Sequence, residues 1–422
     1  MKTVGASSVA LAGCLGGGGG GDGDGSPADQ DAGATTTTAG STEPIVVAAT
    51  TALSGRLSQL GKDIHTGYQI GVERINDEGG IDGRELELVI KDDQSDPKTV
   101  RTQLQQIVSN NDVDMIWGSF SSLLVTAGSA FAESQELPFL GVTFAFEAPH
   151  RKKNFEWTFA PFTKSRDIAA STLELVKTIP SGERPGAVGI WEPNTGWGAE
   201  MAERWESVFS DAGYDVVLRE QYQLGSSDFS TLISKSKSAG VELLMGNPIP
   251  PGGITAMKQM KTNNFAPELI MFIRAPDSYG WWDALGEDGE YVVDAGPAWV
   301  PGLDTPGSET VIERYRAQDG VSSDAIPGVV VGDAYGLTQT AEQALAAADS
   351  TEPEAIREVL RSATFETTMG TFAFDEYGMP KKGQIIAPVG QWWNGKLRLV
   401  YPESDAENYM PLEYPMKPWG ER

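Results

Sequence analysis

Residues 44–80, PIVVAATTALSGRLSQLGKDIHTGYQIGVERINDEGG, decide the fold class. The apolar, β-branched run Pro44–Thr51 ends before the turn-like pair Ser54-Gly55, which predicts a buried strand. Apolar residues then recur at helical spacing, at Ile64, Tyr68, Val72 and Ile75, and Gly79-Gly80 closes the predicted helix. A buried strand followed directly by an amphipathic helix is the unit from which parallel sheets are built.

The same alternation continues along the chain. Strands are predicted at 85–93, 113–119 and 138–142, with helices at 96–110 and 122–134 between them. The pattern restarts with helices near 166–177 and 201–212 and from 228 and 253, and strands at 186–191, 214–220, 241–246 and 268–273. Because helical crossovers between parallel strands are right-handed, we expect an α/β fold with two doubly wound parallel-sheet lobes.

The last third of the chain is less regular. Helical patterns occupy 308–318, 332–347 and 353–362. Residues 370–402 instead alternate apolar and polar side chains between Gly and Pro turns, which predicts antiparallel strands. Within them Asn394-Gly395 is a strong hairpin signal.

Charge and cysteine usage exclude several function classes. The chain of 422 residues carries 59 acidic and 32 basic side chains, a formal charge of −27, which disfavours binding to nucleic acid. Because salt screens such self-repulsion, we expect a halophilic source, with a basic partner as the alternative. One cysteine allows no internal disulfide, and neither CxxC spacing nor a Cys/His cluster indicates a metal site.

The single cysteine, Cys14, has a position that points to membrane anchoring. In MKTVGASSVALAGC, residues 1–14, a short apolar run ends in Leu11-Ala12-Gly13-Cys14, which resembles the lipobox of a lipoprotein signal, here of a haloarchaeal type. The Gly-, Asp- and Thr-rich residues 16–42 would then form a flexible acidic tether. "KTVGAS" looks like the continuation of a twin-arginine signal peptide beginning upstream of Met1. The alternative is an incidental cysteine in a disordered segment.

Residues 54–97, SGRLSQLGKDIHTGYQIGVERINDEGGIDGRELELVIKDDQSDP, resemble the opening of the leucine/isoleucine/valine-binding family of type I periplasmic solute-binding proteins, and "DFSTLISKSK" and "TTMGTFAFDEYG" match further along. The resemblance implies a venus-flytrap molecule whose two lobes are joined by three crossover strands. It serves an ABC importer by closing on a small molecule and delivering it to permease subunits. We expect a signal and linker at 1–43, one lobe at 44–160 plus 299–372, and a second at 161–298 plus 373–422. The predicted location is extracytoplasmic, at the cell surface, with the membrane reached through the lipid anchor only, as a monomer.

Ligand contacts are expected just past the strands, where open parallel sheets bind small molecules. In the first lobe the candidates are Ser121, Ser122, Thr143 and Phe144, in the loops GSFSS and GVTFAF. By the resemblance these loops offer hydroxyls and backbone amides to the ligand's carboxylate, and Ser122 aligns with the family's carboxylate-binding serine. Ser121 or Ser122 could instead be a simple helix cap. In the second lobe the candidates are Trp197, Asn247 and Arg274, with interlobe packing as the alternative for Trp197.

Arg274 departs from the family pattern, which places an acid near this point to pair with an amino acid's ammonium group. An arginine would repel an ammonium and attract a second anionic or carbonyl group. Three possibilities stay open: Asp277 takes over the acidic role, the ligand is an aromatic or other organic acid, or it is an amide. A branched-chain amino acid or related small carboxylate therefore remains the general expectation.

Catalysis is not indicated. His65 and His150 have no nucleophile motif beside them and are expected to be surface or capping residues, and the basic run Arg151–Lys153 to be a solvated loop. No cofactor or metal is expected. A sensor lobe for signalling is the alternative to transport, because one fold can serve both.

Overall fold

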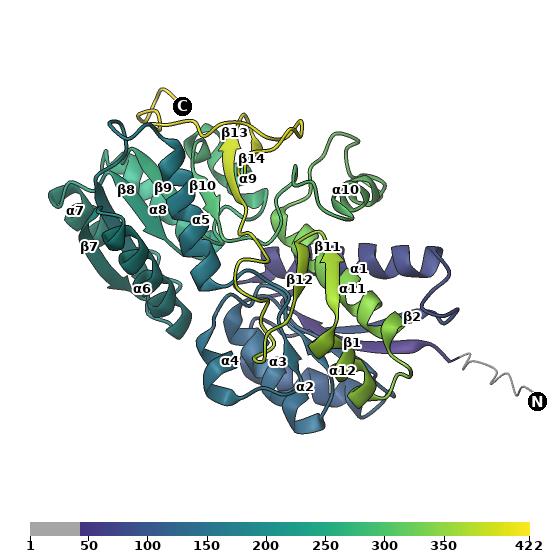
Figure 1. Cartoon of the computed structure of the whole chain (residues 1–422). Helices are drawn as coiled ribbons and strands as arrows, with labels where there is room; N and C mark the ends of the chain where they lie inside the picture. The colour runs from purple at the N-terminus through teal and green to yellow at the C-terminus, as the bar shows by residue number, and fades with distance from the viewer. Residues whose placement is uncertain (1–42) are drawn as a thin grey trace, which may run out of the picture. The chain divides into compact units, whose positions relative to one another are not determined.

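The first sheet contains the strand that opens the folded sequence. In the computed structural model, which describes residues 43–422, this sheet has five parallel strands in the order β2-β1-β3-β4-β5 (Figure 1). They are β1 (Ile45–Thr51), β2 (Leu86–Asp92), β3 (Met115–Trp117), β4 (Phe139–Leu140) and β5 (Thr158–Phe159). The predicted signal, Cys14 and the tether at 16–42 lie outside the described residues.

Helices from both ends of the chain accompany this sheet. They are α1 (Ser58–Asp77), α2 (Pro97–Val108), α3 (Ser122–Gln135), α10 (Ser308–Arg316), α11 (Val329–Ala347) and α12 (Pro353–Ser362). Helices α1 and α11 pack closely because α1 has glycines at the contact. A Cβ on Gly71 would lie 2.0 Å from Thr338 Oγ1, and one on Gly67 2.4 Å from the Val331 carbonyl oxygen. Larger residues there would force the two helices apart.

The second sheet has seven strands in the order β14-β13-β10-β9-β8-β6-β7. They are β6 (Ala187–Pro193), β7 (Asp215–Tyr222), β8 (Leu243–Gly246), β9 (Leu269–Phe272), β10 (Val293–Ala295), β13 (Val389–Trp393) and β14 (Lys396–Tyr401). The five strands from β6 to β10 are parallel, whereas β13 and β14 are antiparallel. The predicted hairpin joins β13 and β14, with Asn394 at φ 48° and Gly395 at φ 73°.

The helices of the second lobe form two groups. Helix α5 (Ser165–Thr178) packs against α6 (Gly196–Asp211), while α8 (Pro250–Thr262) packs against α7 (Ser230–Ser238) and α9 (Gly280–Leu285). A 3₁₀ turn follows at Gly286–Gly289. Two groups of helices are what a doubly wound sheet requires, because each face of a parallel sheet must be covered.

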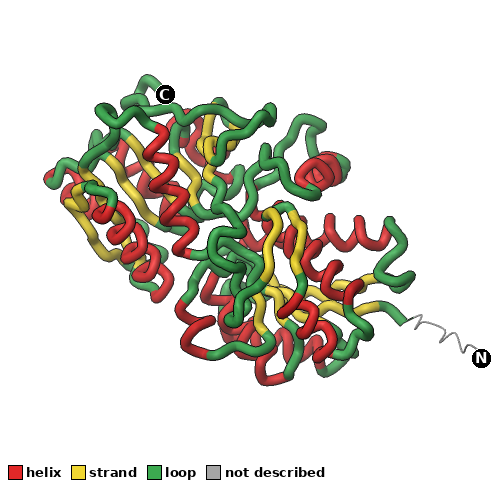
Figure 2. The backbone as a smooth tube through the Cα atoms, viewed as in Figure 1, coloured by secondary structure: helices red, strands yellow, loops and turns green. Residues whose placement is uncertain are grey.

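Three stretches of chain connect the two sheets. They follow β5, β10 and β12, and Figure 2 shows them as loops between the two sheets. A small antiparallel pair, β11 (Thr364–Thr367) and β12 (Gly370–Ala373), precedes the third connection. The predicted α/β fold with two doubly wound lobes is therefore confirmed, whereas the exact lobe boundaries stay a prediction.

Some local predictions were wrong. The basic run Arg151–Lys153 belongs to a short helix, α4 (Ala148–Lys153), and is not a loop. His150 is fully buried and not at the surface: its Nδ1 lies 3.0 Å from the Tyr377 carbonyl oxygen and its ring 4.6 Å from that of Phe144. Helix α9 and strand β10 were not predicted.

Within residues 43–422 the structure contains no helix that combines the length and the apolar character needed to cross a bilayer.

Candidate functional site

A mainly apolar hollow lies where loops from both sheets meet. It has a volume of about 660 Å³, within the range of pockets that bind small molecules. Five of the seven predicted site residues line it: Ser121, Ser122, Trp197, Asn247 and Arg274. Each follows the carboxyl end of a parallel strand, namely β3, β6, β8 or β9. We call this hollow the central cavity.

The corner between β3 and α3 forms the first wall. Ser121 has a positive φ of 78° and occupies the N-cap position of α3, but its side chain makes no capping hydrogen bond. Its Oγ is buried and has no hydrogen-bond partner among the described residues. Capping therefore does not account for this hydroxyl, which lies free beside the first N–H groups of a helix.

Two hydrogen bonds position this corner. The buried Tyr68 hydroxyl donates to the carbonyl oxygen of Gly118 at 2.8 Å. The N–H of Ser121 donates to Thr143 Oγ1 at 3.1 Å. Thr143, itself at φ 54°, is fully buried and does not line the central cavity. Its hydroxyl accepts a hydrogen bond from the backbone of Ser121, so Thr143 positions Ser121 without lining the cavity itself.

Phe144 also lies behind the cavity wall. Its ring is fully buried against His150, and its carbonyl oxygen accepts a hydrogen bond from Lys164 Nζ at 2.6 Å. Burial lowers the pKa of Lys164 to about 7. A ligand contact through the Phe144 ring does not fit this structure, because the ring is enclosed by the lobe's own side chains.

The second lobe contributes two further polar atoms without partners. Trp197 lies in the first turn of α6, which is capped by the Thr195 hydroxyl accepting from the N–H of Gly198 at 2.9 Å. Trp197 Nε1 and Asn247 Nδ2 are both buried, and neither has a partner among the described residues. Both atoms are hydrogen-bond donors, so the wall offers donors that the protein itself leaves unsatisfied.

Arg274 is buried at the bottom of the cavity, with 4 % of its surface exposed. It has φ 76°, and its N–H and Nη1 donate to the two carboxylate oxygens of Asp277 at 2.9 and 3.3 Å. Its guanidinium carbon lies 5.3–5.4 Å from the ring centres of Phe120, Phe162 and Trp197. These rings come from both lobes, so Arg274 sits at the junction between them.

Buried carboxyl groups surround the Arg274–Asp277 pair. Burial raises the pKa of Asp294 well above its ordinary value, and repulsion from Asp277 adds to this. Burial likewise raises the pKa of Asp333, against the effect of Arg274. Both carboxyl groups thus favour their neutral form, and the only ion pair that Arg274 forms among the described residues is the one with Asp277.

A buried ion-pair cluster fixes the loop that carries Phe146. Glu147 pairs with Arg166 at 2.9 Å, and its N–H donates to Glu200 Oε1 at 2.8 Å. Burial alone would raise the pKa of Glu147, but the charges of Arg166 and Arg204 and the hydrogen bonds from Arg166 together lower it. Phe146 then lies so close to Gly196 that a Cβ there would be 3.0 Å from its ring.

The residues that sequence reasoning missed are the aromatic and basic parts of the lining. Phe120 and Phe146 lay within the two predicted loops but were not singled out. Four exposed basic residues also line the cavity: Arg56, Lys98, Arg101 and Lys153. Among the lining residues there is no Asp or Glu. A count of charges along the chain hides this cationic patch, because acidic side chains outnumber basic ones 59 to 32 in the chain as a whole.

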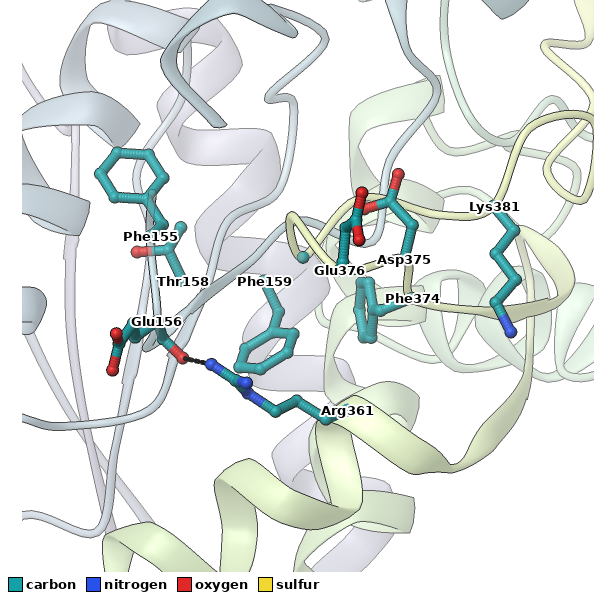
Figure 3. A pocket seen from close by; sticks show the side chains of 10 residues that line it. Phe155, Glu156, Thr158, Phe159, Arg361, Phe374, Asp375, Glu376 and Lys381 are labelled. Atoms are coloured by element: carbon teal, nitrogen blue, oxygen red, sulfur yellow. Dashed lines mark hydrogen bonds between the residues drawn. The ribbon is translucent and has the colours of Figure 1, made fainter. Parts of the chain in front are cut away.

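A second hollow is smaller and does not fit a ligand as well. It has a volume of about 190 Å³ beside β5 and α12 (Figure 3). Arg361 Nη2 donates there to the Glu156 carbonyl oxygen at 3.2 Å. None of its lining residues carries a buried polar atom without a partner, in contrast to the central cavity.

Across residues 43–422, no group of three or more His, Cys, Asp or Glu side chains is arranged to hold a metal ion.

Comparisons with known proteins agree on one family. The family model "Periplasmic binding protein" matches residues 44–390. A "Leu/Ile/Val-binding protein homolog 7" of Brucella abortus is 27% identical over 384 residues, covering 87% of this chain and 94% of the relative. The crystal structure of a leucine-binding protein from Thermotoga maritima aligns with a TM-score of 0.73 at 18% identity, covering 84% of this chain and 97% of that one. A solute-binding protein from R. palustris in complex with benzoate aligns with a TM-score of 0.72 at 16% identity, covering 85% and 95%.

Proposed function

This chain belongs to the periplasmic binding protein family, and from that premise we propose that it is the substrate-binding component of an ABC importer. Its ligand is a small carboxylate held in the central cavity between the two lobes. The R. palustris neighbour supports both the transport assignment, through its description as an ABC transporter solute-binding protein, and an organic acid, through its bound benzoate. The Brucella abortus relative supports a binding role through its name. The lobes close on the ligand by hinge motion and deliver it to permease subunits.

One observation carries the ligand class. Ser121 Oγ, Trp197 Nε1 and Asn247 Nδ2 are buried polar atoms without partners among the described residues, and all three residues line the central cavity. All three can donate a hydrogen bond, and the indole and amide nitrogens can only donate. A ligand rich in acceptor atoms is therefore required to satisfy them, and a carboxylate is the simplest such group.

The charge of the cavity favours an organic acid over an amino acid. An α-ammonium group needs a carboxylate partner, yet the lining contains five basic residues and no acidic one. Asp277, which could have filled that role, is paired with Arg274 and does not line the cavity. We therefore infer a ligand without an α-ammonium, such as an aromatic or branched aliphatic acid.

A matched pair of ligands tests this. Purified protein is titrated calorimetrically with leucine and with 4-methylpentanoate, which is leucine without its amine. We expect 4-methylpentanoate to bind at least tenfold more tightly, because leucine would bring an ammonium beside Arg274 with no acid to receive it. Tighter binding of leucine would overturn the organic-acid assignment and restore the amino acid.

We also propose that the protein works outside the cytoplasmic membrane as a lipid-anchored monomer. The lipobox-like residues at 11–14 support this. Mass spectrometry of the N-terminal peptide from a membrane fraction should find Cys14 acylated at its amino end, and Cys14→Ser should release the protein from membranes. Membrane association that persists in the Cys14→Ser variant would contradict the anchor.

A further inference from the structure

The central cavity has a second cationic region apart from Arg274. Arg56 lies in the loop between β1 and α1, Lys98 and Arg101 lie at the start of α2, and Lys153 ends α4. All four are exposed, in contrast to Arg274. We call these four residues the basic rim.

The basic rim is not neutralised by the protein. Among residues 43–422 no side chain forms an ion pair with Arg56, Lys98, Arg101 or Lys153. Lys98 interacts electrostatically with the nearby Asp96. Lys153 Nζ lies 5.9 Å from the ring centre of Phe155. The chain as a whole has 59 acidic and 32 basic residues, whereas the lining of this cavity has basic residues and no acidic one.

The rest of the cavity lining is mainly apolar. Phe120, Phe146 and Trp197 belong to it together with aliphatic side chains such as Leu57 and Ile249. Flat aromatic or bulky aliphatic bodies fit such a lining, because apolar surface is buried against apolar surface. The cavity thus combines unpartnered donors and a buried cation, an apolar lining, and four exposed cations.

Closing of the two lobes makes the unpaired charges of the basic rim energetically unfavourable. When the lobes close, cations beside the ligand lose part of their hydration, and an unpaired cation in a dehydrated site is strongly disfavoured. A ligand with one carboxylate satisfies the end at Ser121 and Arg274 but leaves the rim without a counter-charge. A second anionic group on the ligand would supply it.

We propose that the preferred ligand is a dianionic organic acid with an apolar body, whose first carboxylate lies by Ser121 and Arg274 and whose second anionic group lies by Arg101 and Lys98. This rests on the proposed function, since it specifies the ligand class for the same cavity. It also predicts that charge, and not size alone, sets ligand preference.

Three para-related probes of one shape test the proposal. Benzoate carries one carboxylate, terephthalate adds a second, and 4-(aminomethyl)benzoate adds a positive group instead. Calorimetric titration at low ionic strength should find terephthalate at least tenfold tighter than benzoate, and 4-(aminomethyl)benzoate weaker than both. Terephthalate that binds no tighter than benzoate would overturn the proposal.

Variants locate the second group. Exchanging Lys98 and Arg101 for Gln together should weaken terephthalate about tenfold and benzoate clearly less, so that the terephthalate-to-benzoate affinity ratio falls. Lys62→Gln, an exposed cation on α1 that does not line the cavity, should leave both affinities unchanged. An unaltered terephthalate-to-benzoate ratio in the Lys98→Gln, Arg101→Gln double variant would also overturn the proposal.

The same titrations distinguish failure of the proposed function from failure of the dianion proposal. If none of these acids nor 4-methylpentanoate binds while leucine does, the organic-acid assignment of the proposed function is wrong. If benzoate and 4-methylpentanoate bind but terephthalate gains nothing, the proposed function stands and the dianion is rejected.

Discussion

The Arg274–Asp277 pair gives the sharpest prediction about this molecule. Replacing Arg274 with Gln removes the cation that balances Asp277, whose side chain is completely buried. Breaking a buried pair on one side costs about 3–5 kcal/mol, because the remaining charge has neither water nor partner. The neighbouring Asp294 and Asp333 cannot replace the lost cation, because a carboxyl group is neutral or negative. Burial raises the pKa of both well above the ordinary value.

The loss should depend on pH with a definite sign. In the Arg274→Gln variant, the buried Asp277 carboxylate has no cation beside it, so burial disfavours its charged form in the folded state. Folding then costs more as the pH rises and the carboxyl group must be ionised, and stability is regained as the pH falls. The variant should therefore be more destabilised at pH 8 than at pH 5.5.

A double-mutant cycle separates the pair from other effects. Asp277→Asn alone leaves a buried cation, whereas the Arg274→Gln, Asp277→Asn double variant contains neither charge. We expect the double variant to be more stable than the sum of the single losses predicts, by about 1–3 kcal/mol. Because its buried charges are removed together, it is also the folded protein in which to measure ligand binding.

The assay should use urea, since guanidinium chloride would screen the chain's charge of −27. Tryptophan fluorescence follows unfolding, and calorimetry with benzoate follows binding. Losing a charge-assisted hydrogen bond should weaken benzoate about 10- to 100-fold in the double variant. Strictly additive single losses would refute the pairing, and an unchanged benzoate affinity would refute the role of Arg274 in the site.

Three further variants test the surroundings of the site. Tyr68→Phe leaves the buried Gly118 carbonyl without its donor and should cost about 1–3 kcal/mol in urea unfolding; a change below about 0.5 kcal/mol would contradict this. Thr143→Val removes the acceptor for the Ser121 N–H and should weaken carboxylate binding about three- to tenfold. Thr143→Ser keeps the acceptor and should keep the affinity. Equal affinities in both variants would contradict the positioning role of Thr143. Burial raises the pKa of Asp63 from 3.8 to about 7, so folding takes up a proton there and stability falls as pH rises between these values. The Asp63→Asn variant should lose less stability over this pH range. An unchanged pH profile of stability would show that Asp63 does not cause the fall.

The fold could be predicted from the sequence because its signals are local. The run Ile45–Thr51 and the spacing of Ile64, Tyr68 and Ile75 report burial directly, and both elements appear as predicted. Helix α4 could not be predicted this way. It has six residues and a basic run, and it is anchored by His150, whose partner Tyr377 lies 227 residues further on.

The site shows the same division between local and distant causes. Ser121, Trp197 and Asn247 follow strand ends, so a rule about strand ends finds them. The role of Thr143 could not be read from its neighbours, because it depends on a hydrogen bond to Ser121 across a loop. The basic rim was missed for another reason: it is assembled from three separate segments, each of which looks unremarkable in an acidic chain.

A strongly acidic chain and an anionic ligand are compatible once the range of each interaction is considered. At low salt the charge of −27 repels an anion from a distance, and only the basic rim offers attraction near the cavity. At about 1 M salt the screening length falls to about 3 Å, so the repulsion from the distant surface disappears. Contacts made inside the closed cavity are screened far less, because Arg274 and the donors of Ser121, Trp197 and Asn247 are buried. Salt therefore removes the barrier to approach while leaving the contacts that hold the ligand.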